Sequence, residues 1–181
     1  HMKDYDLNVK EHVKVERIKV DSVKTVYLST GEEIKGKSLV IATGANWKKL
    51  DIPGEQENIG NAVAYCPHCD GPFYKDKDVA VIGGGNSGLE AALDLSGIVK
   101  SVIIIEYSSQ LKADKILIDQ ISKRSNISTV TNVQTTEILS RNEKVSGLKY
   151  QARDTNETFR RDISGIFVQI GLVPNSKFLD G

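Results

Sequence analysis

The glycine-rich segment at residues 83–88 limits the possible fold more than any other feature of this sequence. Its residues are Gly83, Gly84, Gly85, Asn86, Ser87 and Gly88, a G-x-G-x-x-G pattern. An apolar run at 79–82 directly precedes it, and apolar residues at helical spacing follow at 89–98. A strand, a glycine loop and a helix in this order open a dinucleotide-binding β-α-β unit. The sequence therefore predicts an α/β chain with a parallel sheet and a Rossmann-like FAD/NAD(P)-binding fold.

Each glycine of this pattern has a physical role in such a unit. Gly83 permits the tight turn after the strand, Gly85 lets the backbone approach a pyrophosphate, and Gly88 allows close packing of helix on strand. The free N–H groups at the helix N-terminus then face the phosphates. We expect the six residues of the segment to contact a nicotinamide dinucleotide. The alternative is a glycine-rich turn that binds nothing.

Glu106 follows the next apolar run, Val102–Ile105. The dinucleotide fingerprint has an acidic residue roughly 20 residues after the glycines, where its carboxylate accepts the ribose 2′-hydroxyl. A carboxylate there repels a 2′-phosphate, and residues 107–109 include no arginine that could bind one. NADH is therefore favoured over NADPH. The alternative is a solvent-facing glutamate at a strand end.

Two cysteines, Cys66 and Cys69, lie in the segment Cys-Pro-His-Cys shortly before the glycine loop. Cysteines at this spacing can form a strained disulfide, and one thiol can react as a thiolate when nearby charge lowers its pKa. Zinc needs four ligands, and the chain has no second Cys-x-x-Cys motif. A purely structural disulfide is unusual in the cytoplasm. The same motif occurs in thioredoxin-fold dithiol oxidases, where it opens a long helix, but Gly71-Pro72 interrupts the chain here.

A dithiol so close to a nicotinamide site predicts hydride chemistry, in which the nicotinamide reduces a flavin and the flavin reduces the disulfide. His68 could tune the thiols through its charge or be a solvated loop residue. Asp70 could donate a proton to a leaving thiolate or cap a short helix.

The remaining pattern predicts further strands and helices. Alternating segments at 8–26 indicate half-buried antiparallel strands, the apolar run Ser38–Ala42 indicates a buried strand that ends in a tight loop, and residues 46–62 indicate a linker. Later segments predict an amphipathic helix, a parallel strand, a three-stranded β-meander and a last apolar strand, at 112–124, 127–130, 133–163 and 166–170.

Composition excludes several classes of partner. The 24 basic and 24 acidic residues cancel, so no net charge attracts nucleic acid or an anionic membrane. No apolar run approaches the roughly 20 residues that span a bilayer, and the N-terminus lacks the apolar core of a signal peptide, so we expect a cytoplasmic protein. His1-Met2 is typical of a cleaved expression tag, which suggests a chain taken from something longer.

Taken together, these residues resemble the thioredoxin reductase-like flavoprotein disulfide reductases, and within them the group of alkyl hydroperoxide reductase F subunits. The resemblance extends over almost the whole chain. Its most specific stretches are Tyr65–Pro72, Val79–Gly88, Lys112–Asp114 and Gly165–Asn175. Thioredoxin reductases proper usually have other residues between the cysteines and basic residues after the second strand.

The resemblance implies an electron path from NADH to FAD, then to the Cys66–Cys69 disulfide, then through a thioredoxin-like N-terminal dithiol domain to a peroxiredoxin that reduces hydroperoxides. It implies that Cys69 lies against the flavin, that Cys66 attacks the next disulfide and that Asp70 donates the proton. Thr43, Gly44 and Ala45 would touch the FAD. The family also implies a homodimeric full-length protein.

The chain departs from the family's pattern at both ends. The first FAD-binding glycine loop is expected before residue 1, and the second FAD segment after Gly181. We therefore expect residues 1–62 to be the middle part of an FAD domain, residues 63–168 a nicotinamide domain with the dithiol, and residues 169–181 a return into the FAD domain. Such a fragment should bind FAD poorly or not at all and have no turnover of its own. A nucleotide-binding redox module without catalysis, and an NADPH-dependent thioredoxin reductase, remain the alternatives.

Overall fold

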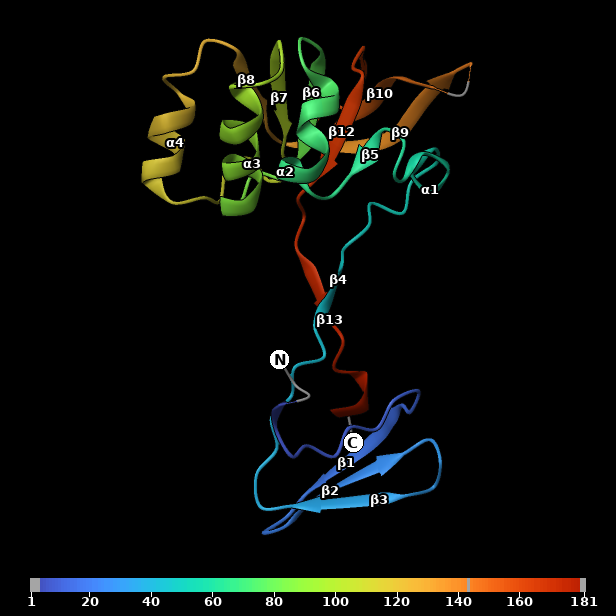
Figure 1. Ribbon diagram of the computed structural model, residues 1–181. Helices are drawn as coiled ribbons and strands as arrows, with labels where there is room; N and C mark the ends of the chain where they lie inside the picture. Colours follow the sequence, from blue (N-terminus) through green and yellow to red (C-terminus); the bar gives the residue numbers. More distant parts are fainter. Residues whose placement is uncertain (1–3, 143, 180–181) are drawn as a thin grey trace. The chain divides into compact units, whose positions relative to one another are not determined.

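The computed structural model describes residues 4–142 and 144–179 and divides the chain into two compact units (Figure 1). The first unit comprises residues 1–46 and 173–181, and the second comprises Trp47–Leu172. The boundary between them thus falls at the start of the predicted linker. Each unit is described separately below.

A five-stranded parallel sheet is the centre of the second unit. Its strands lie in the order β5 (Val63–Ala64), β12 (Gly165–Val168), β6 (Asp78–Ile82), β7 (Ser101–Ile105) and β8 (Ile127–Val130). Helices α3 (Asn86–Ser96) and α4 (Lys115–Ile121) make the connections from β6 to β7 and from β7 to β8. The predicted Rossmann-like α/β fold with a parallel sheet is confirmed.

The predicted β-meander is also present, as an antiparallel sheet in the order β11-β10-β9. Its strands are β9 (Val133–Arg141), β10 (Lys144–Ala152) and β11 (Thr158–Arg161). In Figure 1 the helices α3 and α4 lie on one side of the parallel sheet, and β9 and β10 lie on the other.

Alternating residues of the parallel strands build two separate hydrophobic clusters. On the helix side, Val81 and Ile104 pack with Leu89 and Leu95 of α3. On the meander side, Ile82 and Ile105 pack with residues of β9 and β10 such as Ile138 and Leu148. Because both faces are covered, the strands are apolar at nearly every position, which is why they appear in the sequence as continuous apolar runs.

Short elements surround the cysteines. The segment 46–62, predicted as a linker, overlaps the end of β4 (Ala45–Trp47) and contains the one-turn helix α1 (Glu55–Asn58). Helix α2 (Pro67–Asp70) and the 3-10 helix η2 (Gly71–Tyr74) follow β5.

Glu55, in α1, is only 2% exposed. Its carboxylate accepts hydrogen bonds from the backbone N–H groups of Leu50 and Asp51, at 2.9 and 2.7 Å, so the linker folds back on itself around a buried acid.

The first unit contains an antiparallel sheet in the order β1-β2-β3. These strands are Val15–Val20, Lys24–Leu28 and Glu33–Gly36. The alternating pattern at 8–26 predicted the first two, whereas the third was not predicted. The unit also contains the 3-10 helix η3 (Lys177–Leu179). The strand β13 (Leu172–Pro174) pairs with β4.

One predicted strand is wrong. Residues Ser38–Ala42 form neither helix nor strand, and the side chain of Val40 is 89% exposed. An apolar run becomes a strand only where neighbouring strands pair with its backbone, and no strand in the described part of the chain does so here.

None of the helices within the described residues has the length and hydropathy of a membrane-spanning segment.

Candidate functional site

The dithiol segment and the glycine loop both follow strands of the same parallel sheet. Cys66 comes just after β5, and Gly83 directly follows β6. Only β12 lies between these two strands. Carboxyl ends of parallel strands lie at the same edge of a sheet, and adjacent strands are about 4.8 Å apart, so the two segments leave the sheet roughly 10 Å from each other. Ligands of open α/β sheets bind at this edge.

The geometry of the glycine loop suits a bound pyrophosphate. Gly83 has φ of 118°, a conformation that side chains other than glycine's rarely adopt, and a Cβ there would collide with the carbonyl of Gln169. A Cβ on Gly88 would collide with the carbonyl oxygen of Gly83, so the start of α3 lies directly on the loop. A Cβ on Gly85 would meet nothing within 4 Å. Gly85 therefore borders open space beside the helix N-terminus, where a phosphate can approach the backbone.

Glu106 lies where the fingerprint places its acid, directly after β7, and is 8% exposed. Its carboxylate accepts hydrogen bonds from the backbone N–H groups of Gly84 and Ser108, at 2.6 and 2.7 Å. It thus connects the glycine loop to the loop after β7. The solvent-facing alternative is wrong, and Glu106 has a structural role besides any contact with a ribose.

A segment that composition and spacing did not mark also contacts the glycine loop. The backbone N–H of Lys112 donates to the carbonyl of Gly84 at 2.9 Å. The side-chain amide of Asn86 donates to the Asp114 carboxylate at 2.9 Å and accepts from the backbone N–H of Asp114 at 2.8 Å. Only the resemblance of Lys112–Asp114 to the family suggested this segment, because its distance from the loop in sequence gives no local pattern.

Arg153, on the turn between β10 and β11, was not predicted as a site residue. Its guanidinium lies 3.8 Å from the centre of the Tyr107 ring and donates to the Tyr107 carbonyl at 3.2 Å. Residues 107–109 contain no arginine, but the fold supplies one from the β-meander. The argument against a 2′-phosphate must therefore depend on Glu106 alone.

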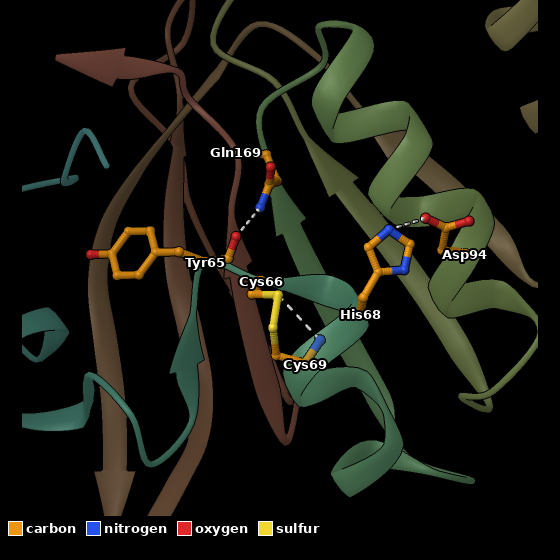
Figure 2. The surroundings of a disulfide bond; sticks show 6 residues. All are labelled: Tyr65, Cys66, His68, Cys69, Asp94 and Gln169. Atoms are coloured by element: carbon orange, nitrogen blue, oxygen red, sulfur yellow. Dashed lines mark hydrogen bonds and ion pairs between the residues drawn. A yellow bond between two sulfur atoms is a disulfide. The ribbon is translucent and has the colours of Figure 1, made fainter. Parts of the chain in front are cut away.

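Figure 2 shows Cys66 and Cys69 joined by a disulfide, with Cα atoms 5.3 Å apart. Cys66 is the N-cap of α2, and its sulfur accepts a hydrogen bond from the backbone N–H of Cys69 at 3.2 Å. Cys66 is half-buried, whereas Cys69 is exposed. A thiolate on Cys66 would keep this N–H contact, which favours the charged form.

His68 lies between the cysteines and extends away from the disulfide toward α3. Its Nε2 is 3.4 Å from a carboxylate oxygen of Asp94, and its side chain is 79% exposed (Figure 2). The imidazole is thus largely solvated, and the group that it contacts is a carboxylate of α3 rather than a sulfur.

Asp70 ends α2 and lines a cavity of about 330 Å³ together with Phe73, Tyr74 and residues 60–64. It makes no capping hydrogen bond to η2, which counts against the capping alternative. Burial, followed by the charge of Asp70, raises the pKa of Tyr74. Asp70 therefore borders this cavity and directly follows Cys69 in the chain, and its role as a proton donor stays a prediction.

Thr43, Gly44 and Ala45, the residues expected to touch FAD, lie in the first unit, whereas the other predicted site residues lie in the second. The Thr43 hydroxyl donates to the carbonyl of Asn175 at 2.8 Å, and the Asn175 side chain donates to the carbonyl of Thr43 at 3.0 Å. Asn175 also donates its backbone N–H to the carbonyl of Gly44 at 3.0 Å. The predicted FAD segment is thus held by the segment 173–175.

Comparison with known proteins agrees with this geometry. The chain is 47% identical to the alkyl hydroperoxide reductase F subunit of Pseudomonas putida, and 46% identical to a protein of Ferdinandcohnia aciditolerans named NADH dehydrogenase. The matches cover 100% of this chain and 35% of each of those proteins. Among solved structures, the thioredoxin reductase of T. acidophilum has a TM-score of 0.81 at 38% identity, over 94% of this chain and 56% of that one.

The resemblance inferred from the residues is therefore confirmed, and the chain spans only about a third of the length of these curated relatives. The sequence profile of the pyridine nucleotide-disulphide oxidoreductases matches residues 1–181. Since this profile covers the whole chain, the chain belongs to the pyridine nucleotide-disulphide oxidoreductase family.

Proposed function

We propose that this chain is the nucleotide-binding and dithiol-bearing part of an NADH-dependent flavoprotein disulfide reductase that supplies electrons to a peroxiredoxin. One observation carries the proposal: the Cys66–Cys69 disulfide and the glycine loop Gly83–Gly88 leave the same edge of one sheet, separated by a single strand. A disulfide with only a structural role has no reason to lie beside a dinucleotide loop.

In this function the residues of the second unit bind and orient the dinucleotide. The backbone of Gly85 and the N-terminus of α3 receive the pyrophosphate, and Glu106 receives the ribose hydroxyls. NADH, when bound, would supply a hydride, and FAD would supply the route by which its two electrons reach the disulfide. Thr43, Gly44 and Ala45 contribute to the FAD site of the complete protein.

The chain's own chemistry is then a balanced two-electron reduction. The Cys66–Cys69 bond breaks, and the two electrons of the hydride together with its proton and one further proton yield two thiols. Asp70, beside the cavity next to α2, supplies a proton to the leaving sulfur. In the complete protein Cys69 would react with the flavin, and Cys66 would attack the next disulfide, in an N-terminal dithiol domain that reduces the peroxiredoxin. The relatives named as F subunits of alkyl hydroperoxide reductase support this route.

We place the reaction in the cytoplasm, since a dithiol that NADH keeps reduced needs a compartment that contains NADH. The choice of NADH over NADPH depends on Glu106, which is held rigidly by two backbone N–H groups. A relative named NADH dehydrogenase supports it. The second candidate is an NADPH-dependent thioredoxin reductase. The observation in its favour is Arg153 on Tyr107, a cation beside the loop that Glu106 anchors.

Calorimetric titration of the purified chain with NADH and with NADPH tests the proposal, with the disulfide kept oxidised. We expect tighter binding of NADH. Glu106→Gln keeps the size of the side chain and one acceptor oxygen but removes the charge, so it should reduce the preference for NADH over NADPH by roughly tenfold, the effect of one charge-assisted hydrogen bond. The matched control is Glu157→Gln, at an exposed position just before β11.

The outcomes separate the two candidates. A preference for NADPH that Arg153→Ala removes would establish the thioredoxin reductase assignment. Equal loss of NADH and NADPH in Glu106→Gln would mean that Glu106 acts only by shaping the loops through Gly84 and Ser108. Binding of neither nucleotide would contradict the proposal.

A further inference from the structure

We propose that Gln169 is a positioning residue of the dithiol, which holds the backbone that enters Cys66 and thereby sets how readily the disulfide is reduced. The inference deepens the proposed function and rests on it, because it concerns the same dithiol. It assigns a role to a buried glutamine that directly follows β12, the strand between the one that leads to the cysteines and the one that leads to the glycine loop.

Gln169 is 8% exposed, an unusual position for a glutamine, and its side chain is directed at the dithiol segment. The side-chain Nε2 donates to the carbonyl oxygen of Tyr65 at 2.9 Å (Figure 2). Tyr65 directly precedes Cys66. A buried amide that donates to a single backbone carbonyl fixes that peptide, since leaving either partner unpaired is costly.

The backbone of Gln169 contacts the other half of the site. Its N–H donates to the carbonyl of Ile82 at 2.8 Å. Its carbonyl lies so close to Gly83 that a Cβ on that glycine would collide with it. One residue therefore contacts the start of the glycine loop through its backbone and the start of the dithiol segment through its side chain. The two contacts are separable, because a substitution of the side chain leaves the backbone bonds in place.

Tyr65 is held on its other side as well. Its ring stacks on Trp47, with centroids 6.0 Å apart and planes at 18°, and its hydroxyl lies 3.2 Å from a carboxylate oxygen of the buried Glu55. The ring and the carbonyl of Tyr65 are thus fixed by different elements. The peptide between Tyr65 and Cys66 has little freedom to move when the disulfide opens.

This restraint bears on the redox equilibrium. Reforming the disulfide requires the two sulfurs to meet, and the effective concentration of one thiol at the other is highest when the backbone of both cysteines is already positioned. Removal of the Gln169 hydrogen bond gives the backbone at Cys66 more freedom to move. The reduced dithiol gains more freedom than the cross-linked form, so the disulfide becomes easier to reduce.

The test is an equilibrium titration of the purified chain in glutathione buffers, with the oxidised fraction counted by thiol alkylation and mass spectrometry. It needs neither NADH nor flavin. We expect Gln169→Met, which keeps length and removes the donor, to lower the equilibrium constant for disulfide formation roughly two- to tenfold, the range of one neutral hydrogen bond. The matched control is Gln120→Met on the exposed surface of α4, which should leave the constant unchanged.

A second variant and a binding measurement distinguish loss of the hydrogen bond from loss of the fold. Gln169→Glu keeps the shape, and at a pH high enough to ionise it a carboxylate faces the Tyr65 carbonyl, so there its equilibrium constant should fall at least as far as that of Gln169→Met. NADH binding equal to wild type shows that the backbone contacts to Ile82 and Gly83 persist. Wild-type equilibrium constants in both variants would overturn the inference and leave the proposed function standing. A wild-type disulfide that glutathione never reduces would contradict both.

Discussion

At the scale of single residues, the glycines of the loop differ in how much space a side chain would have. A Cβ at Gly88 meets the carbonyl of Gly83, whereas a Cβ at Gly85 meets nothing. Gly88→Ala should therefore lower the free energy of unfolding by about 1–3 kcal/mol, as overpacking does. Gly85→Ala should cost less than about 1 kcal/mol, the range for alanine at an N-cap, yet weaken NADH binding because the methyl group occupies the approach to the phosphates.

Thermal unfolding and calorimetric titration with NADH on the two variants check this difference. Each variant is the control for the other, since both substitutions add one methyl group to the same segment. A Gly85→Ala protein that binds NADH as tightly as wild type would show that the pyrophosphate does not approach Gly85.

Tyr65 gives a prediction for pH dependence. Burial, then the charge of Glu55 and its hydrogen bond, raise the pKa of Tyr65 from 10.0 to about 12. The folded protein therefore holds this proton more tightly than the unfolded chain. The stabilisation is fully present below pH 10 and is lost as the pH rises toward about 12. Absorbance titration of the phenols should show one group near pH 12 that is missing in Tyr65→Phe.

Glu55→Gln separates the causes of this shift. It removes the charge but leaves the burial, which is the largest cause, so the pKa of Tyr65 should fall part of the way and remain above 10. A return to the ordinary value would show that Glu55, rather than burial, dominates.

Residue types alone indicated part of the candidate site. The glycine loop, Glu106 and the cysteine pair follow from spacing, because each obeys a local rule that the backbone must satisfy. Arg153 and Gln169 could not be found in this way. Each acts through a contact with a residue distant in the sequence, Tyr107 and Tyr65, and no local pattern reports such a contact.

At the scale of elements, long periodic segments were predictable and short ones were not. The apolar runs that became β6 and β7 are buried on both faces, so continuous hydrophobicity identified them. The strand β5 has two residues and helix α1 has four, too few for any period to be visible. The strand predicted at Ser38–Ala42 is wrong for another reason. Its apolar residues fit the pattern of a buried strand, but none of the described strands pairs with it.

At the scale of the whole molecule, the arrangement that matters most for function is the strand order β5-β12-β6. The strand β12 comes last of the five in the sequence, yet it is inserted between the strands that lead to the dithiol and to the glycine loop. Local patterns do not specify strand order, which depends on which long-range pairings bury the most apolar surface. The role proposed for Gln169 exists only because of this insertion.

The division into two units gives a last prediction. Both hydrophobic clusters of the second unit consist of residues between Leu50 and Ile170, and the glycine loop and the disulfide lie in the same range. A chain limited to residues 47–172 should therefore unfold cooperatively and bind NADH within about twofold of the affinity of residues 1–181, because no contact that shapes the nucleotide loop is removed.

A shorter chain, residues 47–168, is the matched control. It ends at the predicted boundary of the nicotinamide domain but lacks the Gln169 bonds to Ile82 and Tyr65 and the bond from Lys48 to the carbonyl of Gly171. We expect it to melt at a lower temperature than residues 47–172 and to bind NADH more weakly. Equal melting temperatures for the two chains would show that the segment after β12 does not stabilise the second unit. The second unit would then end at Val168. Weak binding by both would mean that the first unit helps to shape the nucleotide site.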